Sequence, residues 1–292
     1  MKLAVIVDST AYLLDEFAEN PDVYQVDLAV QFNDGSVQID TSNKQEVQSF
    51  YDKLQQSDHL PTTSQPPLGM YYELMDQLIE TGYTHALFIV LSSQISGTYQ
   101  TAHMVAEEYS DRLTTYVVDS KSASVVTEYL ARATFIFKDE GQSFDEIVKN
   151  LEWLVGERQI YLMVDDLNNL VKGGRLKQSE ALLGGLLRIR PLLYFDEAGE
   201  IKLFEKIRSD KRVYKRWLQL IDESIEKYPQ GIHIALAHGD DYEGIEEVRQ
   251  LISEHYPDHY IRVALLGPVV GTHTGRKSKG MGIFPNLERK EG

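Results

Sequence analysis

The fold of this chain is decided by residues 86–100, which read ALFIVLSSQISGTYQ. The first six residues are apolar, as in a strand that is covered on both faces of a parallel sheet. Polar residues and Gly97 follow at once, where the pattern predicts the start of a helix. Free backbone N–H groups and hydroxyls at a helix start suit a small anion. This stretch therefore predicts a parallel α/β fold with an anion-binding group where a strand gives way to a helix.

The second hydroxyl-rich segment, residues 61–66, reads PTTSQP and is also expected as a loop between a strand and a helix. Its hydroxyls include those of Thr62 and Thr63. Outside these two segments the chain offers almost none of the groups that catalysis requires. The sequence therefore favours a protein that holds an acidic molecule over one that transforms it.

The composition excludes several classes of function. The chain has 292 residues, 42% of them hydrophobic, which is enough for one large or two medium domains with a buried core. Its formal net charge is -16. Because nucleic acid and anionic membranes both bind basic surfaces, neither is expected as a direct partner.

The chain contains no cysteine, which excludes disulfides, thiolate nucleophiles and cysteine-based metal sites. The first residues run directly into a strand-like segment, so no signal peptide is expected. No apolar stretch approaches the roughly 18–20 residues of a membrane span. We therefore expect a cytoplasmic protein without an integral membrane segment.

Short apolar strands alternate with amphipathic helices in the first half of the chain. The predicted strands are residues 3–7, 87–91 and 116–118. Two helices are expected to start at capping boxes, one formed by Ser42 with Gln45 and one by Ser143 with Glu146. Such alternation is typical of a mostly parallel sheet with helices on both faces. We assign residues 1–157 to an N-terminal α/β domain.

The second half has a different pattern. Apolar runs at residues 192–195 and 201–204 flank the turn-forming residues 196–199, which predicts a β-hairpin. A long helix is expected at residues 209–228. The other predicted strands are residues 160–164, 233–237 and 260–266, the last of these being the final strand of the chain. We assign residues 158–292 to a smaller C-terminal α/β domain with a hairpin.

Two glycine-rich loops of the second half carry basic residues that could meet an anion. In residues 172–175 two glycines precede Arg175 and permit a tight turn that aims the guanidinium. In residues 267–275 glycines and threonines surround His273, which can donate a hydrogen bond to a carboxylate. The alternatives remain a solvated turn for Arg175 and a structural or exposed histidine for His273.

Helix capping is the alternative function for two polar strand ends. Residues 8–10 read DST and are expected to cap a helix rather than to contact a ligand. Gly97 lets a ligand approach the backbone closely, and Ser96 can donate or accept a hydrogen bond. For these two residues capping and ligand binding both remain open.

The chain lacks the sequence patterns of metal sites and nucleotide sites. The eight histidines show no zinc-site spacing, so no metal is expected. Asp165 and Asp166 are expected to cap the helix that follows them. Near the C-terminus Arg276 stands directly before Lys277, where a phosphate-binding loop requires glycine. We therefore expect no metal, nucleotide or other cofactor.

Taken together, these segments resemble the DegV family over nearly the whole chain. Each motif is modest by itself, but their order and spacing together are specific. The segments that carry the resemblance are residues 8–10, 61–66, 92–100, 119–121, 164–167, 172–175, 189–191, 206–208 and 267–275.

The resemblance implies a two-domain α/β fold with one long-chain fatty acid buried in a tunnel between the domains. The residues it implies for the carboxylate are Thr62, Thr63, Ser96, Gly97 through its N–H, Arg175 and His273. It also implies that Arg208 docks a partner fatty acid kinase. In that system the separate kinase subunit phosphorylates the bound fatty acid, and the acyl phosphate enters phospholipid synthesis. The resemblance thus implies a lipid carrier that is not itself an enzyme.

Three departures from the family pattern bear on the site. Gln94 stands where the family often has glycine, so its side chain is expected to narrow the carboxylate end. Residues 125–128 replace a glycine-rich helix start and are expected to reshape the wall that meets the acyl chain. Arg276 lies in a segment where proline and glycine are usual, which affects the local backbone of the last loop.

A small acyl or phosphoryl hydrolase, with Ser96 as nucleophile and His273 as base, is the main alternative. The chain lacks a nucleophile elbow and an obvious acid to orient the histidine. A transcriptional regulator is disfavoured by the acidic charge and by the lack of a helix-turn-helix pattern. We take a monomer as the default state.

Overall fold

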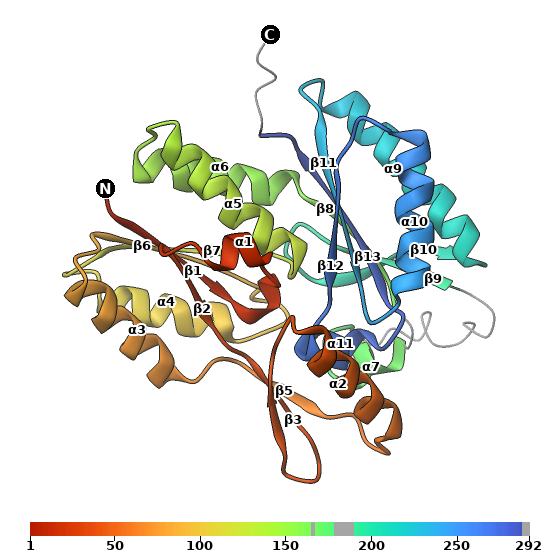
Figure 1. Ribbon diagram of the computed structural model, residues 1–292, viewed down its shortest axis with the longest axis horizontal. Helices are drawn as coiled ribbons and strands as arrows, with labels where there is room; N and C mark the ends of the chain where they lie inside the picture. Colours follow the sequence, from red (N-terminus) through yellow and green to blue (C-terminus); the bar gives the residue numbers. More distant parts are fainter. Residues whose placement is uncertain (165–166, 178–189, 288–292) are drawn as a thin grey trace.

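The computed structural model describes residues 1–164, 167–177 and 190–287 (Figure 1). The N-terminal half, residues 1–157, is built around a parallel sheet in the order β2-β1-β6-β7. Its strands are β1 (Leu3–Asp8), β2 (Val23–Val26), β6 (His85–Val90) and β7 (Thr114–Asp119). The predicted parallel sheet is confirmed.

Helices cover both faces of this sheet because its strands are apolar on both faces. Leu3, Val5 and Val7 of β1 pack against one pair of helices, whereas Ala4 and Ile6 pack against the other. The first pair is α5 (Val125–Asp139) and α6 (Phe144–Glu157). The second pair is α3 (Leu68–Glu80) and α4 (Thr98–Glu108).

The C-terminal half, from residue 158 onward, contains a mixed six-stranded sheet in the order β10-β9-β8-β13-β11-β12. Its strands are β8 (Gln159–Met163), β9 (Arg190–Phe195), β10 (Ile201–Ile207), β11 (Ile232–His238), β12 (Ile261–Leu265) and β13 (Lys279–Pro285). One face packs against α9 (Asp210–Lys227) and α10 (Tyr242–His255). The other face packs against α5 and α6, which therefore lie between the two sheets (Figure 1).

A small antiparallel sheet makes a second contact between the halves. It contains β3 (Ala29–Gln31), β4 (Val37–Ile39) and β5 (Thr62–Ser64), in the order β4-β3-β5. Beside it, α2 (Lys44–Gln56) packs against α11 (Pro268–Thr274), where Phe50 and Tyr51 share a cluster with Val269. The Tyr51 hydroxyl donates to the Leu266 carbonyl at 3.1 Å. The remaining short helices among the described residues are η1 (Ser9–Ala11), α1 (Asp15–Ala18) and α7 (Leu167–Lys172).

Several local predictions are confirmed. The hairpin predicted around residues 196–199 is formed by β9 and β10, which pair antiparallel. Ser143 and Glu146 form a capping box at the start of α6. The Asp8 side chain accepts from the Thr10 N–H at 2.9 Å and caps η1, as expected for residues 8–10.

Other local predictions are wrong. The residue that caps α2 is Asn43, not Ser42, because the Asn43 side chain reaches the N–H groups of Gln45 and Glu46. The hydroxyl-rich segment 61–66 contains strand β5, and the glycine-rich segment 267–275 is largely helix α11, so neither is simply a loop. The segment predicted as the last strand is followed by β13. Asp165 and Asp166 lie outside the described residues.

The assigned domain boundary at residue 157 coincides with the end of α6. Among the described residues, the strands before it and the strands after it belong to different sheets. None of the helices in the described part of the chain combines the length and apolar character needed to cross a membrane.

Candidate functional site

A cavity of ≈ 200 Å³ lies where the two halves meet. The N-terminal half contributes β5, the start of α4 and the loop before α5, and the C-terminal half contributes β8, α11 and β13. Most of the wall is apolar. The apolar lining residues are Leu28, Leu91, Ile95, Ala123, Val125, Ile160, Leu162, Met163, Val164, Leu170, Phe195, Ile201, Ala237, Leu266, Val269, Val270 and Met281.

His273 lines this cavity from α11, which brings it against β5 of the other half. Its Nε2 lies 2.9 Å from the Thr63 hydroxyl. Its Nδ1 is buried and has no hydrogen-bond partner among the described residues. Burial, and after it the positive charge of Arg175, lowers the pKa of His273 to about 3. The imidazole is therefore neutral at physiological pH and can still donate one hydrogen bond.

Arg175 lines the cavity beside His273. Its Nε donates to the Ile95 carbonyl at 2.9 Å and its Nη1 to the Gly173 carbonyl at 2.6 Å, which fixes the guanidinium. Burial lowers the pKa of Arg175. Across the described ranges no carboxylate oxygen lies within 4.0 Å of its guanidinium nitrogens, and both protein partners are neutral carbonyls. A partly buried positive charge is thus left without a counter-charge from the described part of the chain.

Two glycines allow the turn that carries Arg175 to pack closely. A Cβ atom on Gly173 would lie 2.5 Å from His273 Nδ1 and 2.9 Å from the Asn169 carbonyl, so a larger residue does not fit. Gly174 has φ +75, a backbone conformation that glycine adopts without strain. The Gly-Gly-Arg sequence therefore lets the end of α7 contact α11.

Ser96 and Gly97 lie between β6 and α4 and line the same cavity. The Ser96 hydroxyl is 2.8 Å from the Thr98 hydroxyl and accepts from the Thr98 N–H at 3.3 Å. Gly97 is the N-cap of α4, and a Cβ atom there would overlap the Gln65 side-chain amide. The start of α4 and the hydroxyl-bearing residue Ser96 thus belong to the same cavity wall as Arg175.

The structure therefore gathers five of the predicted site residues and leaves out others. Those that line the cavity are Thr63, Ser96, Gly97, Arg175 and His273. Thr62 is exposed and is not among the lining residues, although Thr63 and Ser64 of the same strand are. Arg208 is exposed in the turn between β10 and α9.

The departures from the family pattern have clear places in the structure. Gln94 is exposed and is not among the residues that line this cavity, but it lines a neighbouring pocket together with Arg175, so the expected narrowing stays a prediction. Arg276 pairs with Asp52 at 2.7 Å and also with Asp240, which ties α2 to the end of β11. Val125 lines the cavity, as expected for a residue that shapes its wall.

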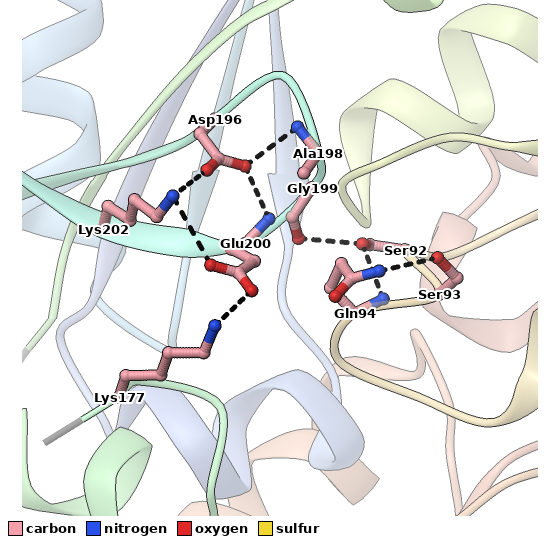
Figure 2. A network of polar contacts seen from close by, with 9 residues as sticks. All are labelled: Ser92, Ser93, Gln94, Lys177, Asp196, Ala198, Gly199, Glu200 and Lys202. Atoms are coloured by element: carbon pink, nitrogen blue, oxygen red, sulfur yellow. Dashed lines mark hydrogen bonds and ion pairs between the residues drawn. The ribbon is translucent and has the colours of Figure 1, made fainter.

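Sequence reasoning missed the role of the hairpin turn. Figure 2 shows the turn beside the loop that follows β6, where the Ser92 hydroxyl donates to the Gly199 carbonyl at 2.8 Å. The Asp196 carboxylate accepts from the N–H groups of Ala198 and Glu200 and holds the turn in shape. Because Phe195 and Ile201 beside the turn line the cavity, this contact closes part of its wall. The Asp-x-x-Gly pattern predicted the turn, but nothing in it indicated the Ser92 contact.

The contacts of Ser96 and His273 do not resemble those of a hydrolase. Ser96 bonds Thr98 and His273 bonds Thr63, and no hydrogen bond joins Ser96 to His273 among the described residues. In the same residues, no group of three His, Asp or Glu side chains is arranged to hold a metal ion. The arrangement suits binding of an anion with an apolar tail.

The family model described as an uncharacterised protein of the DegV family matches residues 2–286. The chain belongs to the DegV family. A DegV domain-containing protein of Streptococcus pneumoniae is 36% identical over 285 residues, which cover 98% of this chain and 99% of that protein. The DegV resemblance inferred from the motifs is confirmed.

Solved DegV structures share the whole fold. The fatty acid binding DegV family protein of Streptococcus agalactiae has a TM-score of 0.90 and 33% identity, covering 98% of this chain and 99% of that one. DegV of Bacillus subtilis, described as a fatty acid binding protein, has a TM-score of 0.87 and 32% identity, covering 98% and 100%. The predicted fold class, a helix-flanked parallel sheet with a smaller C-terminal domain of antiparallel strands, agrees with these structures.

Proposed function

We propose that this protein binds one long-chain fatty acid in the cavity between its halves. The observation that carries the proposal is an apolar cavity lined by Arg175, whose charge no carboxylate balances among the described residues. Two DegV relatives of similar fold, each about one-third identical, are described as fatty acid binding. Their descriptions support the same ligand class here.

The two ends of such a ligand contribute differently to binding. Burial of the acyl chain supplies about 0.8 kcal/mol per methylene, so the tail drives affinity. A carboxylate cannot be buried without hydrogen bonds and a compensating charge. In this proposal Arg175 supplies the charge. Hydrogen bonds come from Thr63, Ser96, His273 and the Gly97 N–H.

Mass spectrometry of lipid extracted from the purified full-length protein tests the proposal. We expect a long-chain fatty acid in about equimolar amount. An extract without fatty acid, from protein that also takes up none when it is added, would rule out this function.

We further propose that the protein is a carrier and that a separate fatty acid kinase phosphorylates the bound carboxylate, giving an acyl phosphate for phospholipid synthesis. The proposed docking residue is Arg208, which is exposed and lies away from the cavity lining. Its position supports a role in partner contact rather than in ligand binding.

Arg208→Ala is expected to retain fatty acid but to lower kinase-dependent formation of acyl phosphate. Lys149→Ala, which removes an exposed cation from α6, is the matched control and should leave turnover unchanged. Equal turnover by Arg208→Ala and the unmodified protein would remove Arg208 from the partner surface.

A further inference from the structure

The cavity wall includes two serine residues that take no part in the proposed fatty acid carboxylate site. Ser122 and Ser124 lie in the loop between β7 and α5, and both line the cavity. They are 0% and 6% exposed, and their hydroxyl oxygens have no hydrogen-bond partner among the described residues. Because a buried hydroxyl without a partner is unfavourable, these two side chains favour a ligand that supplies one.

The hydroxyl nearer to α5, that of Ser124, does not cap this helix. Ser124 is the N-cap residue of α5, where a serine side chain ordinarily accepts from a backbone N–H of the first turn. It makes no such bond, and its backbone has φ 60 and ψ -122. A non-glycine residue in this region is strained, and strain that persists is common at ligand sites. The helix start therefore gives no structural reason for the serine.

The surroundings of the two serines distinguish them from the carboxylate end. Ala123 and Val125, their neighbours in sequence, also line the cavity and are apolar. Among the described residues, the cations that line it are Arg175, assigned to the carboxylate, and Lys279, which is paired with Asp241. A neutral oxygen on the ligand thus suits Ser122 and Ser124 better than a second carboxylate.

We propose that the preferred ligand is a hydroxy fatty acid and that Ser122 and Ser124 bind the hydroxyl carried by its acyl chain. This inference rests on the proposed fatty acid binding and specifies the class of acid. A chain hydroxyl can donate to one serine and accept from the other, whereas a plain chain leaves both without partners. Sites with buried polar groups of this kind discriminate against ligands that lack the matching group.

Competition on the full-length protein tests the inference. The protein is incubated with stearic acid and positional isomers of hydroxystearic acid in equal amounts, and the retained lipid is identified by mass spectrometry. One isomer, or two neighbouring ones, should be retained on the order of fivefold or more over stearic acid, the effect of one additional net hydrogen bond. Ser122→Ala combined with Ser124→Ala should abolish this preference by reducing retention of the hydroxystearic acid to that of stearic acid.

Two further variants make the result interpretable. Ser124→Gly removes the hydroxyl and relieves the backbone strain, so it should fold and still reduce the preference. Thr127→Val is the matched control, because the Thr127 hydroxyl is also buried without a partner but does not line the cavity. It should keep the preference.

The possible failures are distinguishable. If stearic acid competes equally with every isomer on the unmodified protein, the inference is overturned and fatty acid binding stands. A preference that survives in the double variant also overturns it. If the protein retains neither kind of acid, the proposed function fails and this inference fails with it.

Discussion

Arg262 and Arg175 both make contacts between the two halves of the molecule. Within the described residues, a carboxylate balances the charge of Arg262 but none balances that of Arg175. Arg262 of β12 pairs with Glu128 of α5, both 1% exposed, and its Nη2 donates to the Tyr12 carbonyl at 2.9 Å. Arg175 bonds only neutral carbonyls among the described residues. Burial lowers the pKa of both guanidinium groups, and for Arg262 the charge of Glu128 opposes that shift.

The difference separates a structural contact from a binding contact. Arg262 joins the second sheet to α5 and to the segment after β1, so its counter-charge is part of the fold. Arg175 faces an apolar cavity, where a ligand can bring the missing negative charge. A buried charge is tolerated when it is paired, and the partner can belong to the protein or to the ligand.

The largest expected effect is on stability, from removing the paired arginine. Arg262→Met removes the guanidinium that pairs with the buried Glu128 and should lower the free energy of unfolding by about 3–5 kcal/mol. Urea denaturation of the variant measures this change. The double variant Arg262→Met with Glu128→Leu should recover most of the loss, because replacing a buried ion pair by apolar residues is often nearly neutral.

The exposed pair of Arg249 and Glu246 provides the control, since Arg249→Met should change stability little. If Arg262→Met unfolds at the same urea concentration as the unmodified protein, Arg262 does not stabilise the contact between the two halves.

The next effect is on binding, from removing Arg175, whose charge no carboxylate of the described residues balances. Arg175→Met should weaken fatty acid binding on the order of 100-fold, because a desolvated carboxylate loses its cation. The ligand-free variant should lose much less stability than Arg262→Met, since it loses hydrogen bonds to two neutral carbonyls and no described carboxylate loses a partner. Calorimetric titration measures the affinity for fatty acid. Denaturation of the ligand-free protein measures its stability. A variant that is destabilised to the same degree as Arg262→Met would contradict the contrast between the two arginines.

A smaller effect concerns Asp40, a buried acid whose partners are neutral. Its carboxylate accepts from the Val269 N–H at 2.9 Å and from the Ser9 hydroxyl at 3.0 Å, which joins α11 to the end of β1. Burial raises the pKa of Asp40 to about 7. The folded protein therefore keeps a proton that the unfolded chain releases nearer pH 4, so this group's contribution to stability falls as pH rises toward 7.

Asp40→Asn should accordingly lose less stability than the unmodified protein when the pH is raised from about 5 to about 8. Denaturation at both pH values measures this difference. Asp34→Asn is the control, because hydrogen bonds from Ser36 lower the pKa of Asp34 to about 2 and it does not titrate in this range. Identical pH dependence in Asp40→Asn and the unmodified protein would show that Asp40 is ionised throughout.

The regular parts of the fold could be predicted because their signals are local. Each of these parts has a sequence signal within a few residues. They are the apolar runs of β1 and β6, the capping box at Ser143 and the hairpin turn. Strand β13 could not be found in this way. It pairs with β8 and β11, and Gly280 and Gly282 interrupt its apolar pattern, so it is a strand because of its neighbours.

The sequence indicated most of the residues that form the site, but not how they are arranged. Motif resemblance indicated Thr63, Ser96, Arg175 and His273, all of which line the cavity. Which side chains of β5 face inward depends on strand pairing, so the sequence could not separate Thr63 from Thr62. The pairing of Arg262 with Glu128 depends on residues far apart in the chain and carries no local signal.

The most direct test of the central claim compares a fatty acid with the alcohol of the same chain length, on the unmodified protein and on Arg175→Met. If Arg175 pairs with the ligand carboxylate, the unmodified protein should bind stearic acid on the order of 100-fold more tightly than 1-octadecanol. The variant should bind the two almost equally. An undiminished preference for the acid in Arg175→Met would contradict the account.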